Sequence, residues 1–156
     1  MSTPQYRLDV SCRELPFSAT PHVRDTCLCL HVQRAARALA RRFDEALRPF
    51  DLTQGQFSLL TSLNRPEPPN VGSVAALLAM DRTTLTANLK PLERRGLVKI
   101  AIDKEDKRNR RLIITATGRA LLRKAFPVWQ RTHADTEKSL VGISADTLRA
   151  ALRALS

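Results

Sequence analysis

The stretch of sequence that decides the fold is LLAMDRTTLTANLKPLERRGLVKIAIDKEDKRNRRLIITATG, residues 77–118. It predicts a short helix that runs through a turn into a second helix, followed at once by a β-hairpin. Asp81 is well placed to cap the second helix, and Gly96 supplies the left-handed residue at which helices commonly end. The eight residues between the expected strands, DKEDKRNR, are all polar. The stretch therefore predicts a helix-turn-helix with a charged hairpin attached.

The second helix of this unit, expected over residues 82–95, has two chemically distinct faces. Leu85, Leu89 and Leu92 share one face at 100° per residue and are expected in the core. Threonine, alanine and cations occupy the opposite face. Hydroxyls and cations reach phosphates and base edges in a major groove, methyl groups contact the thymine methyl, and the helix N-terminus points amides at phosphate. The DNA contacts predicted on this helix are Arg82, Thr83, Thr84, Thr86, Ala87, Lys90 and Arg94.

The hairpin tip carries further cations, of which Lys107, Arg108 and Arg110 are predicted to contact DNA. An arginine on such a projection fits the narrow minor groove, where the negative potential is enhanced. Asp106 can orient the guanidinium of Arg108 by a bidentate contact. A solvated charged hairpin is the alternative interpretation. The position of the hairpin directly after a helix-turn-helix favours a DNA-binding wing.

Composition agrees with a nucleic-acid partner. The 156 residues include 26 Lys and Arg against 15 Asp and Glu, a formal net charge of +11, which favours polyanions. The longest apolar run, Val74 to Met80, is far shorter than the roughly 20 residues of a membrane span. The first 20 residues lack the apolar run of a secretory signal. We therefore expect a cytoplasmic protein that does not bind membranes.

Other classes of site are not indicated by the sequence. It contains no glycine-rich phosphate loop, nucleophile elbow or metal-ligand cluster, so we expect no enzyme activity, no cofactor and no metal. Cys12, Cys27 and Cys29 lack zinc-site spacing and are expected as reduced thiols.

Helices are predicted on both sides of the central stretch. One runs from about Asp25 to Phe50, with Asp25 or Thr26 as its cap. Within it, Glu45 is expected to pair with Arg41. Its apolar stripe consists of Leu28, Val32, Ala35, Leu39, Phe43 and Ala46. The next two are expected over 56–63, capped by Thr53, and over 72–79, with inward residues Phe57, Leu60, Leu63, Val74, Leu77 and Leu78. The last two run from about Thr117 to Leu140 and, capped by Ser144 or Asp146, through Leu155.

The runs DRTTLTANLKPLERRGLV and DKEDKRNRRLIITATG resemble the MarR (multiple antibiotic resistance regulator) family of bacterial winged-helix repressors. The phrase LERRGLV matches the end of that family's recognition helix, and Asp103, Asp106 and Arg108 match its D-x-R-D-x-R wing. The resemblance covers roughly residues 25–140. Two departures stand out. Glu105 replaces the first wing arginine, and Pro91 removes an amide hydrogen bond back to Ala87, which leaves the reach of Arg94 and Arg95 open.

The resemblance implies a mainly α-helical fold with a small β-hairpin wing and a homodimer. Residues 51–116 would form the winged helix-turn-helix DNA-binding lobe of a single 1–156 domain, and residues 1–50 and 117–156 the helical dimerisation region. The operator would be a pseudo-palindromic DNA duplex with half-sites about 10 bp apart. Arg108 would enter the minor groove. The implied function is a repressor that a small aromatic or phenolic effector releases.

Two alternatives remain open for function. Cys29 matches the reactive cysteine of the family's hydroperoxide-sensing branch, which would make the protein a thiol-based redox regulator. Gln33 and Phe43 stand where that branch carries tyrosines, so a buried, inert Cys29 is favoured. Cys27 and Cys29 point to different sides of a helix and cannot bridge each other readily, whereas Cys12 pairing across a dimer stays open. The second alternative is an architectural DNA-binding protein of lower specificity.

Overall fold

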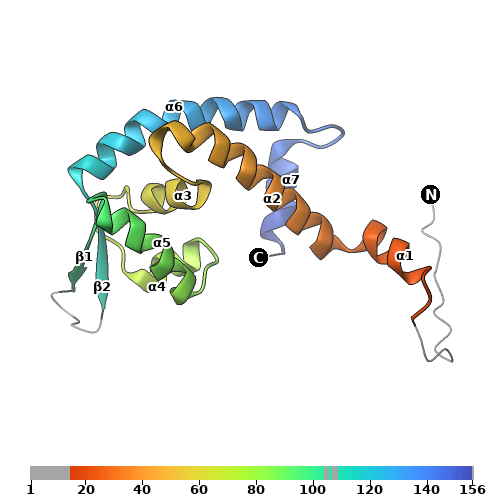
Figure 1. Ribbon diagram of the computed structural model, residues 1–156, viewed down its shortest axis with the longest axis horizontal. Helices are drawn as coiled ribbons and strands as arrows, with labels where there is room; N and C mark the ends of the chain where they lie inside the picture. The colour runs from red at the N-terminus through yellow and green to blue at the C-terminus, as the bar shows by residue number, and fades with distance from the viewer. Residues whose placement is uncertain (1–14, 104–105, 107–108, 156) are drawn as a thin grey trace. The chain divides into compact units, whose positions relative to one another are not determined.

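The computed structural model describes residues 15–103, 106 and 109–155 and is mainly helical, with a two-stranded antiparallel hairpin (Figure 1). The chain divides into two compact units, residues 1–38 and 39–156. The first contains α1 (Ala19–Thr26) and the start of α2 (Leu28–Leu47). The fold class expected from the sequence is confirmed.

The break between α1 and α2 differs from the prediction of one helix capped by Asp25 or Thr26. Both residues lie in the last turn of α1, where the Thr26 hydroxyl donates to the His22 carbonyl at 2.7 Å. Cys27 takes an extended backbone conformation, and its Sγ accepts from the Leu30 amide at 3.5 Å. The predicted caps were wrong because the sulfur of Cys27 satisfies an amide at the start of α2.

The second unit holds the rest of α2 and the remaining elements in chain order. These are η1 (Arg48–Phe50), α3 (Gln54–Ser62), α4 (Val71–Leu77), α5 (Arg82–Arg94), β1 (Val98–Ile102), β2 (Arg110–Ile114), α6 (Ala116–Lys138) and α7 (Ala145–Arg153). Helix α3 contacts α4, α5 and α6, and the hairpin packs against α4 and α5. The core of this unit is leucine-rich, and Leu47, Leu60, Leu85, Leu92 and Leu112 are fully buried.

Local capping accounts for most helix starts in this unit. Thr53 forms a reciprocal capping box with Gln56 at α3, as a threonine three residues before a glutamine favours. The side chains of Asp81 and Ser144 cap α5 and α7 as predicted. Thr115 caps α6 through the Gly118 amide at 3.0 Å, and α6 continues as a helix through Pro127.

Two packing predictions were wrong. Leu77, predicted to be inward, is 60% exposed, because it is the last residue of α4; Val74 is buried as predicted, and Ala75 is buried beside it. Glu45 pairs with Arg48 and not with Arg41, because η1 follows α2 directly and leaves Arg48 one turn away.

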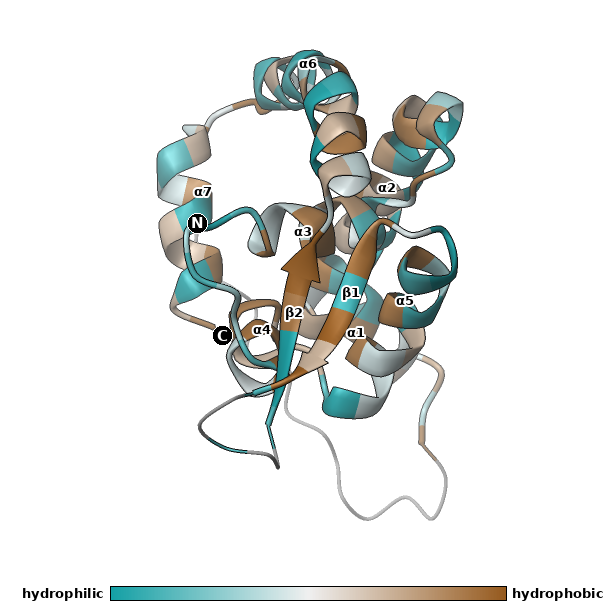
Figure 2. Cartoon of the chain, turned by 90° about the vertical axis from the view of Figure 1, so that its left-hand side faces the viewer, coloured by the Kyte–Doolittle hydropathy of each residue, from teal (hydrophilic) through white to brown (hydrophobic). Residues whose placement is uncertain are grey.

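The hairpin is in simple antiparallel register from Val98↔Ile114 to Ile102↔Arg110. Figure 2 shows β2 changing from hydrophilic at its tip end to hydrophobic toward α6. The loop before α4 extends this sheet. Asn70 forms an isolated antiparallel bridge with Arg111, and the Leu112 amide donates to the Pro69 carbonyl at 2.8 Å.

Candidate nucleic-acid interface

Helix α5 presents the two faces that its sequence predicts. Leu85, Leu89 and Leu92 are at most 2% exposed and lie in the core. All seven of the helix residues predicted to contact DNA are exposed to solvent, namely Arg82, Thr83, Thr84, Thr86, Ala87, Lys90 and Arg94. The lobe therefore offers one helix whose outer surface combines cations, hydroxyls and methyl groups.

The N-terminal turn of α5 is held by Asp81. Its carboxylate accepts from the Thr84 amide at 2.8 Å and from the Thr84 hydroxyl at 2.6 Å. The hydroxyl bond is the main reason that the pKa of Asp81 lies below its ordinary value, with the amide bond second. The hydroxyl proton of Thr84 is thus engaged within the helix, which leaves its oxygen as an acceptor.

The next polar side chains of α5 also bond to their own helix. The Thr86 hydroxyl donates to the Arg82 carbonyl at 2.7 Å, and the Asn88 amide donates to the Thr84 carbonyl at 3.0 Å. A threonine hydroxyl bonded back to the carbonyl four residues earlier has no proton left for DNA. The sequence predicted that threonine hydroxyls on α5 reach phosphates or bases. The geometry shows that Thr86 instead offers its methyl group, because its hydroxyl proton is already bonded within the helix.

Of the three wing residues predicted to contact DNA, only Arg110 lies within the described residues. Arg110 is exposed at the start of β2, and its guanidinium donates to the Asn109 carbonyl at 3.4 Å. Lys107 and Arg108 lie outside the described residues. The predicted roles of all three in binding DNA stay predictions.

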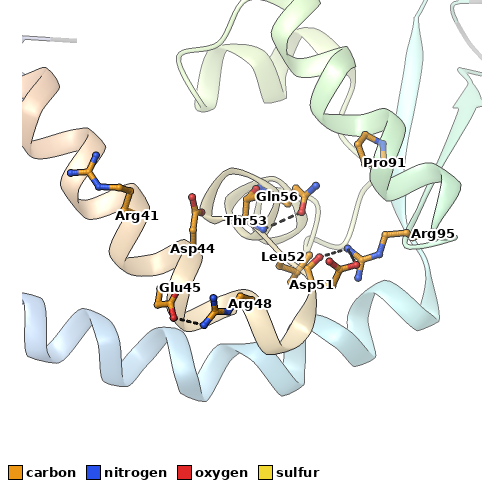
Figure 3. Close-up of a pocket in the computed structure, with 10 residues that line it drawn as sticks. All are labelled: Arg41, Asp44, Glu45, Arg48, Asp51, Leu52, Thr53, Gln56, Pro91 and Arg95. Atoms are coloured by element: carbon orange, nitrogen blue, oxygen red, sulfur yellow. Dashed lines mark hydrogen bonds and ion pairs between the residues drawn. The ribbon is translucent and has the colours of Figure 1, made fainter.

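Sequence reasoning missed the role of Arg95, which follows α5. Its guanidinium donates to the carbonyls of Phe50 (3.2 Å) and Asp51 and lies 3.6 Å from the Asp51 carboxylate. Asp51 itself has a left-handed backbone, with φ of 55°. Figure 3 shows Arg95 directed at this turn. Arg95 and Pro91 both line a cavity of about 620 Å³. Arg95 therefore ties the end of α5 to the turn between α2 and α3 and does not extend the exposed face.

The tip end of the hairpin is held by a contact between Asp103 and Arg111. The Asp103 side chain is 7% exposed and forms an ion pair with the Arg111 guanidinium. The same guanidinium donates to the Pro68 carbonyl at 3.1 Å. Because these residues are eight and forty-three positions from Arg111, no helical or strand period could have indicated the contact.

Aromatic side chains gather between α3 and α6. Trp129 stacks on Phe57 and on Phe126, with ring centroids 5.8 Å apart in both pairs, and lies 4.8 Å from the His133 ring. A cavity of about 430 Å³ adjoins Phe57 and Trp129 and is also lined by Gln54, Ser58, Thr61 and Arg65. The Gln54 Oε1 atom is buried without a hydrogen-bond partner within the described part of the chain.

Cys29 is exposed in this single chain, and its Sγ accepts from the Gln33 side-chain amide at 3.2 Å. The expectation of a buried cysteine is therefore not met in the single chain, because the stripe of α2 that includes Leu28 and Val32 is itself exposed. Cys27 is half-buried, and Cys12 lies outside the described residues.

Among the described residues, no helix is both long and apolar enough to cross a membrane. The same residues contain no group of three or more His, Cys, Asp or Glu side chains able to hold a metal ion.

An exposed, cationic second helix followed by a β-hairpin defines a winged helix-turn-helix protein. The sequence model of the MarR family matches residues 52–109. The chain is 39% identical to the M. tuberculosis transcriptional regulator MosR, solved in complex with DNA, over 83% of this chain and 92% of that one, with a TM-score of 0.76. The chain belongs to the MarR family.

Other relatives agree with this assignment. The transcriptional repressor CouR, solved bound to a 23-mer DNA duplex, is 30% identical over 91% of this chain and 96% of that one, with a TM-score of 0.70. The regulator TtmR of Methylorubrum extorquens is 36% identical over 65% of this chain, and SarZ of Staphylococcus haemolyticus is 30% identical over 58%. These matches span 52% and 62% of the curated relatives, all of which are transcriptional regulators and not enzymes.

Proposed function

We propose that this protein is a sequence-specific DNA-binding transcriptional repressor that acts in the cytoplasm as a homodimer and is released by a small aromatic ligand. The observation that carries the proposal is the outer face of α5, where Lys90 and Arg94 lie exposed beside the Thr86 and Ala87 methyl groups. Cations supply affinity for phosphate, and the apolar groups supply contacts to base edges in a major groove. MosR and CouR, each at least 30% identical, were solved on DNA.

Exposed apolar side chains on the terminal helices support the homodimer. In the single chain Leu28 of α2 is 69% exposed, Val23 of α1 is 53% exposed, and Leu152 of α7 is 41% exposed. Helix α7 has no buried residue although its apolar side chains gather on one face. Amphipathic helices need an apolar partner, and a second copy of the chain supplies one at the N- and C-terminal helices.

The cavity beside Trp129 supports an aromatic effector. Phe57 and Trp129 supply flat apolar walls, and Arg65 lies at the same cavity as a cation for a carboxylate. The buried Gln54 Oε1 is an acceptor that a phenolic hydroxyl would satisfy. Ligand pockets typically combine apolar walls with a few placed polar groups, as here.

DNA recognition is tested by selecting duplexes from a random pool with the wild-type protein and footprinting the product. We expect an inverted repeat with half-sites about 10 bp apart. Lys90→Ala should change or weaken the selected sequence, whereas Lys124→Ala, which removes an exposed cation from α6, should leave the sequence unchanged. Binding without sequence preference would instead identify an architectural protein, and equal effects of the two variants would refute the assignment of the α5 face.

The effector site is tested with Trp129, the single tryptophan, as a fluorescent reporter. We expect 4-hydroxybenzoate to quench its emission at lower concentration than benzoate, by about fivefold, the equivalent of one hydrogen bond of about 1 kcal/mol. Gln54→Met should abolish this preference, whereas Gln130→Met, an exposed neighbour of Trp129, should retain it. A preference that survives in Gln54→Met would contradict the assignment. The thiol alternative centred on Cys29 stays a prediction.

A further inference from the structure

We infer that Arg111 is a positioning residue that fixes the wing, the β1–β2 hairpin, against the loop before α4. The inference rests on the proposed function, since it concerns how the wing is held relative to α5. Arg111 lies near the tip end of the hairpin strands, opposite Ala101 in the register. Its guanidinium bonds to Asp103 on one side and to the Pro68 carbonyl on the other.

The bond to Pro68 connects the wing to the helix-turn-helix, and the bond to Asp103 holds the guanidinium within the wing. Pro68 belongs to the loop that ends in Asn70, and Asn70 caps α4 through the Ser73 amide at 2.8 Å. Helix α4 in turn packs on α5. The backbone bridge between Asn70 and Arg111 joins the same loop to β2, so side chain and main chain hold one junction. A shift of this end of the wing relative to α4 would have to break both the side-chain and the main-chain bonds.

Asp103 is the residue that holds the Arg111 guanidinium in place. Its side chain is 7% exposed, whereas the Arg111 side chain is 38% exposed. Its Oδ1 atom accepts from the Asp106 amide at 3.5 Å, and its own amide donates to the Asn109 carbonyl at 3.1 Å. A buried carboxylate is retained where a cation and amides compensate it, and here they come from the turn of the wing and from Arg111. Asp103 therefore orients the guanidinium toward Pro68.

The bonds of Arg111 also argue against a role in binding phosphate. Its donors Nε and Nη1 are directed at protein oxygens, so its charge is compensated within the lobe. A lysine at this position would keep the charge, but a single ammonium group lacks the planar fork that reaches two oxygens at once. The two bonds at position 111 therefore require the planar guanidinium of arginine and not only a positive charge. The neighbouring Arg110, which is exposed, remains a predicted DNA contact.

The test measures affinity and its salt dependence on a duplex selected from a random pool by the wild-type protein. Asp103→Asn removes one negative charge and so raises the net charge of the protein by one unit, which by electrostatics alone would tighten DNA binding. We expect instead a loss of at least about fivefold, because the wing is released from the loop before α4. Arg111→Lys should lose affinity similarly, with an unchanged slope of log affinity against log salt. Arg110→Gln should lower that slope by about one unit.

A double variant distinguishes loss of wing positioning from a general loss of protein stability. Asp103→Asn with Arg111→Gln removes both charges, so the thermal unfolding midpoint should recover toward wild type while DNA affinity stays low. Recovery of affinity together with stability would overturn the inference, as would unchanged or tighter binding by Asp103→Asn, or a fall of about one unit in the salt slope of Arg111→Lys. Failure of the wild-type protein to bind any duplex would instead overturn the proposed function itself.

Discussion

Thr86 offers the sharpest test of how α5 recognises DNA. Its hydroxyl donates to the Arg82 carbonyl at 2.7 Å, so the group left to face a base is the methyl. Thr86→Val keeps that methyl and removes the hydroxyl, whereas Thr86→Ser keeps the hydroxyl and removes the methyl. If the methyl packs against a thymine methyl, only the serine variant should lose DNA affinity.

The size of this loss follows from the buried apolar group. One methyl-sized group removed from water contributes about 0.8 kcal/mol, or about fourfold in affinity per half-site. A dimer on two half-sites doubles the free energy, so Thr86→Ser should bind roughly 15-fold more weakly. Thr86→Val should stay within about twofold of wild type, because it loses only a bond within an exposed helix turn.

The assay is fluorescence anisotropy on a duplex selected by the wild-type protein, with thymines replaced one at a time by uracil, which lacks the methyl. At the contacted position the wild-type protein should lose about fourfold, and Thr86→Ser should lose nothing further. Weak binding by Thr86→Val with full binding by Thr86→Ser would refute the reasoning, because it would show that the hydroxyl contacts DNA.

Three further predictions follow from local geometry. A Cβ on Gly118 would lie 2.2 Å from the Leu97 carbonyl oxygen. Gly118→Ala should therefore lower the free energy of unfolding by about 2 kcal/mol in urea titrations, despite the better helix propensity of alanine, and an unchanged value would show that α6 can shift. The hydrogen bond from Thr84 lowers the pKa of Asp81, so the stability that this carboxylate adds is complete above its ordinary pKa of about 3.9 and is lost as the pH falls through the lower folded value. Asp81→Asn should flatten the thermal midpoint between pH 5 and pH 2 (both approximate) relative to wild type, and parallel curves would count against this carboxylate. If Cys29 senses oxidants, peroxide should release DNA from the wild-type protein but not from Cys29→Ser, and equal responses would exclude it as the sensor.

The sequence by itself determined the elements whose signals are local. Helix α5 begins directly after its cap Asp81 and is followed by Gly96, whose φ is 67°, because a capping carboxylate and a left-handed glycine act within a few residues. The burial of Leu85, Leu89 and Leu92 followed from a period of 3.6 residues. The exposed face of α5 and the hairpin after it were therefore predictable, and with them the class of protein.

Only the tertiary structure decided which cations remain available for DNA. Arg95 and Arg111 look like their neighbours in the sequence, yet one bonds to the Asp51 turn and the other to Asp103 and Pro68. Their partners at positions 51 and 68 lie more than forty residues away, beyond the reach of any helical or strand period. A guanidinium forms such bonds where the folded chain leaves carbonyl and carboxylate oxygens without donors, and that condition exists only after the distant segments have packed together.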